Sequence, residues 1–332
     1  MRDFARRSEG DRRDLFRATA QTMRVSEAIV EKDFWVCWIL DYLFNNSPWQ
    51  FDIAFKGGTS LSKAYAAIQR FSEDVDLILN WTLLGFDPGE LLKKRSVNKQ
   101  AELNKQANER CAEFLGKKFI HTIRDSLSEI AGQKIEVEID KEDSQSVLIQ
   151  YPRTFSLAAI RPEIILEVGP LAAWAPNEPK EIRPYASEKF PDLFKQKMTI
   201  VSTVVAERTF WEKATILHQE AHRPENKQLP SRHSRHYYDL YRLSLLPVRD
   251  RAFAQLDLLE RVAVFKDKFY HSAWARYDTA KSGSFRLTPS EYHLQELKKD
   301  YESMQPMLFG NVPSFEDILI GLDSLEEQIN AL

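Results

Sequence analysis

Cysteine is nearly absent from this chain of 332 residues, which contains only Cys37 and Cys111. Two cysteines do not supply the disulfide framework of a small secreted domain, and Cys37 stands in an apolar helical segment where a buried free thiol is expected. An excess of charge of one sign is also lacking, because the net charge is −3 and the sequence pI is about 6.2. No overall basic field recruits nucleic acid, so any RNA contact must come from a local patch.

Long hydrophobic runs are missing as well. No segment approaches the roughly 18 uninterrupted apolar residues of a membrane-spanning helix, and MRDFARRSEGDRRDLF at the start has no apolar signal core. We therefore expect no membrane segment and a cytoplasmic protein. With 43% hydrophobic residues, the chain is long enough for a large core and two domains.

Residues 51–79 have the pattern of a strand, a glycine turn, a helix and a second strand. Apolar and polar residues alternate in FDIAFK, and Gly57 and Gly58 then interrupt the run. Thr59 or Ser60 is expected to cap the helix that follows. The expected apolar stripe of this helix consists of Leu61, Ala64, Tyr65 and Ile68.

The second strand carries two aspartates on one face. In EDVDLIL, Asp74 and Asp76 alternate with apolar residues, so their carboxylates are neighbours that repel each other. A divalent cation relieves this repulsion, and Mg²⁺ typically uses one or two carboxylates plus substrate phosphates. Backbone N–H groups of Gly58, Thr59 and Ser60, at the positive end of the helix dipole, are candidates for holding such a phosphate. Separately, the glycine pair indicates a turn and DxD a solvated strand face; their combination at this spacing favours a nucleotide site.

GGTSLSKAY followed by RFSEDVDL resembles the signature of the AbiEii/AbiGii toxin family of nucleotidyltransferases, a branch of the DNA polymerase beta-like superfamily. The resemblance is specific over residues 56–77. It implies Mg²⁺ or Mn²⁺ as cofactor, an NTP as substrate, and catalytic and metal-binding roles for Asp74 and Asp76. The residues that it makes candidates for NTP binding in this segment are Gly57, Gly58, Thr59, Ser60, Lys63 and Arg70.

A third carboxylate from a neighbouring strand is a further requirement of polymerase beta-like sites. RPEIILEVGP reads as such a strand, and Glu167 on its polar face is the candidate catalytic residue and metal ligand. Glu163 shares this face but follows Pro162 at the start of the strand, so it ranks second.

Two later segments resemble the family more weakly. ERTFWEKATILH carries Lys213, which the resemblance makes a catalytic residue that binds the triphosphate, with Arg208 close enough on the helix to assist. A surface lysine is the alternative for Lys213. SRHSRHYYDLYRL carries Asp239, the matching acidic residue, which either pairs with Lys213 or acts near the site. His236 is a candidate substrate contact or a helix cap.

Other charged segments have weaker interpretations. Lys32, in an E-K-D triplet that often precedes the core of the resembling family, either reaches a phosphate or lies on a solvated helix face. The basic helix expected over residues 93–119 is either a solvated face or an RNA-backbone contact. His218 and His222 have a spacing that can bind zinc, but HQEAH is not HExxH.

The fold predicted from these patterns is α+β, with a nucleotidyltransferase-type mixed sheet flanked by helices. We expect N-terminal helices over residues 1–48, the nucleotidyltransferase core over 49–200 and a mainly helical C-terminal domain over 201–332. Residues 134–140 and 146–152 are expected to form a hairpin. Residues 170–195, rich in proline, are expected to be an irregular connection, either a domain boundary or a lid.

The implied activity is metal-dependent transfer of NMP from an NTP to an acceptor hydroxyl. By resemblance, the expected acceptor is RNA, at the 3′ end of a tRNA. The physiological role would then be that of a toxin in a toxin–antitoxin or phage abortive-infection system, checked by an antitoxin. The alternatives are a small-molecule nucleotidyltransferase, a protein-nucleotidylating enzyme and a catalytically silent nucleotide- or RNA-binding module. The residues do not specify which NTP is used.

Overall fold

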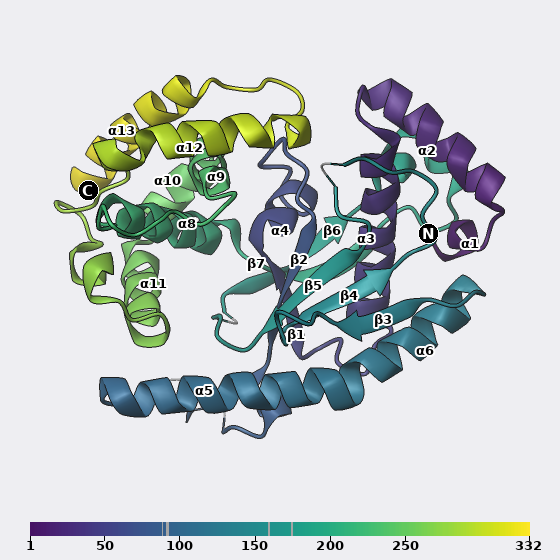
Figure 1. Cartoon of the computed structure of the whole chain (residues 1–332), viewed down its shortest axis with the longest axis horizontal. Coiled ribbons are helices and arrows are strands. Elements are labelled where there is room, and N and C mark those ends of the chain that lie inside the picture. Colours follow the sequence, from purple (N-terminus) through teal and green to yellow (C-terminus); the bar gives the residue numbers. More distant parts are fainter. Residues whose placement is uncertain (88, 91–92, 159, 174) are drawn as a thin grey trace. The chain divides into compact units, whose positions relative to one another are not determined.

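A mixed β-sheet contains all the strands of the computed structural model, which describes residues 1–87, 89–90, 93–158, 160–173 and 175–332. Within these residues the sheet has seven strands in the order β3-β4-β5-β2-β1-β7-β6 (Figure 1). The strands are β1 Ile53–Lys56, β2 Asp74–Leu79, β3 Glu136–Ile139, β4 Ser146–Gln150, β5 Ile164–Gly169, β6 Asn177–Ile182 and β7 Thr199–Val204. The β2–β5 and β1–β7 pairs are parallel, and the other neighbours are antiparallel. The predicted α+β class and the predicted hairpin, now β3 and β4, are both confirmed.

Helices make up most of the remaining described chain. The α-helices are α1 Arg2–Ala5, α2 Glu9–Met23, α3 Glu27–Asn45, α4 Gly57–Lys63, α5 Val97–Phe114, α6 Ile120–Ala131, α7 Tyr185–Lys189, α8 Ala206–Ala221, α9 Ser234–Ser244, α10 Val248–Phe253, α11 Leu256–Phe269, α12 Glu291–Met304 and α13 Phe315–Asn330. A π-helical turn, η3 Leu115–Phe119, continues α5 into α6. None of the helices in the described ranges combines the length and the apolar composition needed to cross a bilayer.

The chain divides into two compact units. Unit 1 comprises residues 1–64, 71–94 and 103–204, and it contains the sheet; unit 2 comprises residues 65–70, 95–102 and 205–332 and is helical. The predicted boundary between residues 200 and 201 falls inside strand β7, and the predicted N-terminal helical region belongs to unit 1.

The two faces of the sheet differ in how they are covered. Val75, Leu77 and Leu79 of β2 belong to the large apolar cluster that also contains most of α3. Ile78, on the opposite face of the same strand, belongs to a small cluster with Ala54 and Val204. The alternation in β2 therefore places Asp74 and Asp76 on the face away from the main core, as the pattern predicts. Cys37 and Cys111 are both buried and free.

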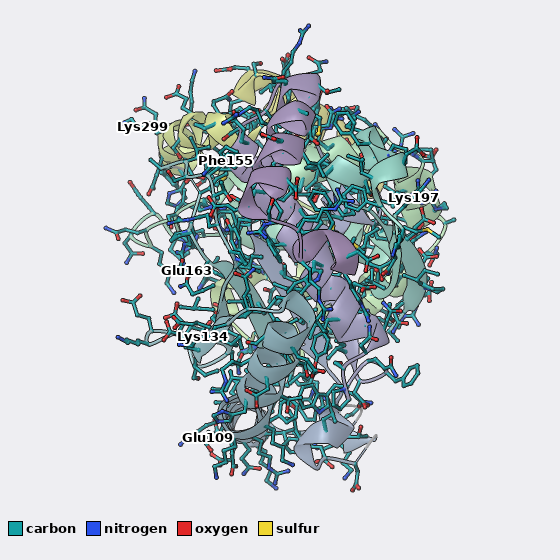
Figure 2. All side chains as sticks on the ribbon, turned by 90° about the vertical axis from the view of Figure 1, so that its right-hand side faces the viewer. Glu109, Lys134, Phe155, Glu163, Lys197 and Lys299 are labelled. Carbon is teal, nitrogen blue, oxygen red and sulfur yellow. The ribbon has the colours of Figure 1, made fainter. Side chains whose placement is uncertain are left out.

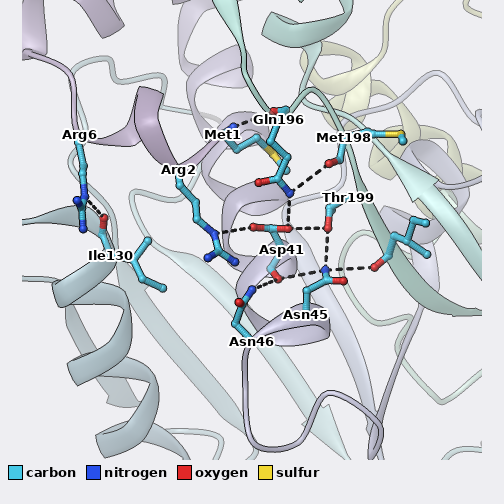
Figure 3. A network of polar contacts seen from close by, with 11 residues as sticks. Met1, Arg2, Arg6, Asp41, Asn45, Asn46, Ile130, Gln196, Met198 and Thr199 are labelled. Atoms are coloured by element: carbon cyan, nitrogen blue, oxygen red, sulfur yellow. Dashed lines mark hydrogen bonds and ion pairs between the residues drawn. The ribbon is translucent and has the colours of Figure 1, made fainter.

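Helix α3 is buried along nearly its whole length, including its charged residues. Ser26 caps it by accepting a hydrogen bond from the Ala28 N–H. Asp41, which interrupts the apolar stripe, is 2% exposed and accepts hydrogen bonds from the Thr199 hydroxyl at 2.7 Å and the Gln196 side-chain amide at 2.8 Å (Figure 3). Arg2 adds an ion pair at 3.2 Å. The carboxylate is therefore compensated, as a buried charge requires.

Helix α4 begins earlier and ends earlier than the helix predicted after the glycine pair. The helix begins at Gly57 itself, with Lys56 as N-cap and no side-chain capping bond, so the expected capping by Thr59 or Ser60 is wrong. It also ends at Lys63, and Ala66 has a φ of +48°, which no α-helix accepts. The expected stripe through Tyr65 and Ile68 is not formed.

The segment that leaves α4 is instead held by long-range contacts within unit 2. The Gln69 carbonyl accepts a hydrogen bond from the Phe309 N–H at 3.0 Å, and the Gln69 N–H donates to the Tyr238 hydroxyl at 3.2 Å. These partners lie far away in the sequence, so a local pattern does not reveal them.

The proline-rich stretch over residues 170–195 is also more regular than predicted. It contains β6, which pairs with β7 from Asn177↔Val204 to Ile182↔Thr199, and the short helix α7. β6 is an edge strand, and an edge tolerates Pro179 because one side of the strand needs no ladder partner. The prediction of an irregular connection is therefore wrong for residues 177–182 and 185–189.

The basic helix expected over residues 93–119 begins later, at Val97. Part of its charge is compensated internally, since Lys105 pairs with Glu109 at 3.9 Å and Lys117 with Glu113 at 2.7 Å. Glu109 on this helix is exposed and is labelled in Figure 2, as is the exposed Lys134, which lies outside the helix. An RNA contact by this helix stays a prediction.

Candidate functional site

Strands β2 and β5 bring three carboxylates to one face of the sheet in unit 1. Their parallel register pairs Asp76 directly with Glu167 and Asp74 with Ile165. Directly paired residues project from the same face, so the side chains of Asp76 and Glu167 are neighbours, with Asp74 two residues along. The register thus places the three predicted metal ligands on one face of the sheet, while their role in metal binding stays a prediction.

Glu163, the second-ranked candidate, lies outside β5. Its Oε1 accepts a hydrogen bond from the Gln150 side-chain amide at 3.3 Å. The residue is labelled in Figure 2. Glu167, inside the strand and opposite Asp76, is the better placed of the two.

Gly57 lies directly against the carboxylate of Asp76. Its φ is +76°, and a Cβ at this position would stand 1.9 Å from Oδ2 of Asp76. Glycine is therefore required twice, for the backbone conformation and for the close approach of the aspartate. The glycine turn and the aspartate pair are one site, as the spacing predicts.

The Gly57→Ala variant should lose nucleotidyl transfer by about 10²-fold, because the new methyl group displaces Asp76 and misplacement of about 1 Å can have this effect. Left-handed backbone strain adds a stability loss of about 1–2 kcal/mol. The measurement is transfer rate together with urea unfolding.

Gly132→Ala is the matched control. Gly132 has a φ of +69°, but no atom lies within 4 Å of its virtual Cβ. We expect a similar stability loss with nearly unchanged transfer. Equal activity losses in the two variants would show that strain, and not displacement of Asp76, is responsible.

The hydroxyl groups of α4 fasten the turn to the second strand. Thr59 Oγ1 donates to the carbonyl of Asp74, and Ser60 Oγ donates to the carbonyl of Gly57 at 2.9 Å. Both side chains are therefore used to hold the backbone. The N–H groups of the first helical turn have no acceptor within the helix. The backbone N–H groups of Gly58, Thr59 and Ser60 therefore remain the predicted phosphate contacts, and the two hydroxyl groups do not.

Lys63, a predicted NTP-binding residue, lies at the buried end of α4. Its ammonium pairs with Asp33 at 2.7 Å and lies 3.9 Å from the centre of the Tyr185 ring. Burial acts to lower the pKa of Lys63, but the charge of Asp33 outweighs burial and raises it. The side chain is 4% exposed. In this structure Lys63 joins α4 to α3, and NTP binding by Lys63 stays a prediction.

Lys56 is a site residue that the predictions missed. It is the last residue of β1, and the antiparallel register with β2 pairs it directly with Asp76. The alternation in FDIAFK already placed Lys56 on a polar face, but only the register shows that this face is the one with the aspartates. A cation beside three carboxylates lowers their mutual repulsion.

The donor set on this face fits a divalent cation that the substrate helps to bind. Among the residues that the structure describes, no three His, Cys, Asp or Glu side chains are grouped closely enough to hold a metal ion alone. Mg²⁺ needs only one or two protein carboxylates when substrate phosphates complete its coordination. Hard oxygen donors at Asp74, Asp76 and Glu167 match this chemistry.

In unit 2, four of the candidate site residues form a second cluster, which is buried. Asp239 accepts from Arg70 through both oxygens, at 2.7 and 2.9 Å, and pairs with Lys213 at 2.8 Å. Nδ1 of His236 lies 3.0 Å from the Lys213 ammonium. The predicted pairing of Asp239 with Lys213 is therefore present, and the surface-lysine alternative for Lys213 is wrong because its side chain is 8% exposed.

The pKa values of three groups in this cluster are shifted from their usual values. Burial alone would raise the pKa of Asp239, but Arg70 and Lys213 outweigh it and hold that pKa below its usual range. Burial lowers the pKa of Lys213 against the opposing charge of Asp239. Burial and the charge of Lys213 hold the pKa of His236 well below its usual value, so its neutral ring can accept from Lys213.

Two other candidates in unit 2 have local partners. Arg208, predicted to assist NTP binding, pairs with Glu212 at 2.9 Å, and its side chain is 4% exposed. His218 lies 3.0 Å from the Arg276 carbonyl and accepts from the Arg286 N–H, and burial lowers its pKa to about 4. Both ring nitrogens of His218 thus have protein partners, which disfavours zinc binding by His218 and His222.

A family model described as nucleotidyl transferase AbiEii toxin of a type IV toxin–antitoxin system matches residues 38–320. The chain belongs to the AbiEii family. The match extends over most of unit 1 and unit 2 and includes the glycine turn, the three candidate metal ligands, Lys213 and Asp239, but not Lys32. This AbiEii protein is accordingly a nucleotidyltransferase toxin of a type IV toxin–antitoxin system, and a catalytically silent module is no longer a competing interpretation.

Among solved structures, the AbiEii chain is similar to MenT4, a nucleotidyltransferase toxin from Mycobacterium tuberculosis H37Rv. The sequence identity is 15%, the TM-score is 0.46, and the alignment covers 95% of this chain and 98% of MenT4. No curated protein matches the chain.

Proposed function

We propose that this AbiEii protein transfers NMP from an NTP to a hydroxyl group of RNA, at the 3′ end of a tRNA, with Mg²⁺ or Mn²⁺ as cofactor. The hydroxyl oxygen bonds to the α-phosphorus, the bond from the α-phosphorus to the β-phosphate breaks, and pyrophosphate leaves. The observation that carries the proposal is the juxtaposition of Asp76, Glu167 and the glycine turn on one sheet face. Phosphoryl transfer depends on positioning and on charge stabilisation, and this face supplies both.

Asp74, Asp76 and Glu167 are the residues that would hold the cation. When bound, a divalent cation supplies Lewis-acid stabilisation of the phosphoryl oxygens and lowers the pKa of the attacking hydroxyl. Gly57 keeps the Asp76 carboxylate at the turn, and the first-turn N–H groups of Gly58, Thr59 and Ser60 orient a phosphate.

Lys213 is the proposed ligand of the triphosphate, and Asp239 orients its ammonium. The 2.8 Å ion pair fixes the ammonium, and an ammonium is a suitable point charge for phosphate. Arg70, Arg208 and Lys63 are further proposed NTP contacts. The proposed setting is the cytoplasm, with a cognate antitoxin as partner and phage abortive infection as one role.

The test is labelling with each of the four NTPs, each supplied with ³²P at the α-phosphate, in the presence of Mg²⁺ and total RNA. We expect label from at least one NTP in small RNA, removed by ribonuclease and resistant to protease, with no label when Asp76→Asn replaces the wild type. Label in protein would instead support protein nucleotidylation. Turnover without RNA would support a small-molecule acceptor.

A further inference from the structure

The E-K-D triplet of α3 is buried in unit 1, which contradicts the solvated-face reading. Glu31 and Lys32 are 0% exposed and Asp33 is 3% exposed. Each side chain contacts a different segment of the unit. Glu31 accepts from the N–H groups of Thr154 and Phe155, and Asp33 pairs with Lys63 and accepts from the Tyr185 N–H.

Lys32 contacts the segments that lead into the two carboxylate-bearing strands. Its ammonium donates to the carbonyl of Arg161 at 3.1 Å and lies 3.8 Å from Oε1 of Glu73. The same Glu73 oxygen accepts from the N–H of Arg161 at 2.9 Å. Lys32 and Glu73 therefore hold both backbone polar groups of Arg161.

The position of these contacts connects them to the site. Glu73 immediately precedes Asp74 in the sequence, and Arg161 lies three residues before the start of β5, which carries Glu167. Pro162 has no N–H, so the N–H of Arg161 is the last backbone donor before Glu163. A one-residue slip of β5 against β2 would turn Glu167 to the opposite face of the sheet.

We propose that Lys32 and Glu73 are positioning residues for nucleotidyl transfer, which fix β5 against β2 and so place Glu167 opposite Asp76. This inference rests on the proposed function of the carboxylate face. A buried ion pair is a poor source of net stability, because apolar residues of similar size do as well or better. In this protein the Lys32–Glu73 pair instead selects one alignment of β5 against β2. Burial lowers the pKa of Lys32, and the nearby charges of Glu73, Asp74 and Glu163 oppose this shift only in part.

The test compares Lys32→Met and Glu73→Gln with Glu31→Gln as the matched control. Glu31 belongs to the same triplet and is equally buried, but its partners Thr154 and Phe155 do not lead directly into a site strand. Rates are measured with the NTP and RNA used for the wild type. Amide hydrogen exchange is measured without nucleotide, with the β6–β7 pair as internal reference.

We expect Lys32→Met and Glu73→Gln to lower kcat by about 10- to 100-fold while KM for the NTP changes less than about threefold. Exchange should accelerate in residues 164–169 and not in β6–β7. The double variant should be no slower than the slower single variant, because both side chains act on one residue. Glu31→Gln should keep kcat within about threefold at a comparable melting temperature.

The proposal fails if β5 exchange is unchanged in both variants, or if Glu31→Gln loses as much kcat as Lys32→Met. Should Lys32→Met not accumulate as folded protein, the nearly isosteric Glu73→Gln decides the question alone. If the wild type transfers no nucleotide, the proposed function fails, whereas the exchange comparison still tests the alignment of β5.

Discussion

Asp76→Asn is expected to lower nucleotidyl transfer by at least about 10³-fold, the scale of effect seen when a group that stabilises transition-state charge is removed. The amide has nearly the same shape as the carboxylate, so the backbone of β2 and the contact with Gly57 remain. It lacks the negative charge that a divalent cation requires. Asp76 is also the residue that faces Glu167 on one side and Lys56 on the other.

Folding should not suffer in this variant. Asp76 stands beside Glu167 and near Asp74, and removal of one of several close carboxylates relieves their repulsion. We expect the free energy of unfolding to rise or fall by less than about 1 kcal/mol, because residues at a functional site are often placed for activity and not for stability. Urea unfolding and transfer rates measured on the same samples check this expectation.

Glu138→Gln is the control for loss of a strand carboxylate. Glu138 is exposed on β3, where the register pairs it with Leu148 and no acidic residue. This variant should retain nearly full activity. An Asp76→Asn protein that stays within about tenfold of the wild type would remove Asp76 from the transfer step, since typical losses are larger.

The placement of the carboxylates was predictable because it depends on short-range periodicity. Alternation in EDVDLIL and EIILEV sets which residues share a strand face, and the resemblance to AbiEii proteins indicated that the two strands are neighbours. The same alternation in FDIAFK contained Lys56, but the sequence did not state that β1 pairs with β2 in the register that sets Lys56 against Asp76.

Features that depend on distant partners were not predictable. Helix α4 stops at Lys63 because the following residues join unit 2 through Gln69, which bonds to residues over 160 positions away. Lys32 was interpreted either as a phosphate contact or as a solvated lysine, because its partners, Glu73 and Arg161, are 41 and 129 residues away in the sequence. Local polarity indicates exposure only when no distant partner compensates the charge.

Asp239→Asn is expected to destabilise the protein by about 3–5 kcal/mol, the usual range when one partner of a buried ion pair is removed. Asp239 is 0% exposed, and it compensates two buried cations, Arg70 and Lys213. The asparagine would fit the same space but would remove the negative charge that Asp239 supplies to both cations. Asp250→Asn is the control, because Asp250 is 68% exposed in its pair with Arg249 and should change stability by less than about 0.5 kcal/mol.

The pH dependence separates this charge effect from a packing effect. Because the pKa of Asp239 is lower in the folded protein than in the unfolded chain, its contribution to stability is complete above the unfolded pKa of about 3.9 and is lost as pH falls toward the folded value. The difference in unfolding free energy between wild type and Asp239→Asn should therefore be constant from about pH 5 to 7 and shrink below about pH 4. Urea titrations at a series of pH values measure it. A difference that stays constant down to pH 3 would mean that the variant disturbs packing, and that Arg70 and Lys213 do not depend on the charge of Asp239.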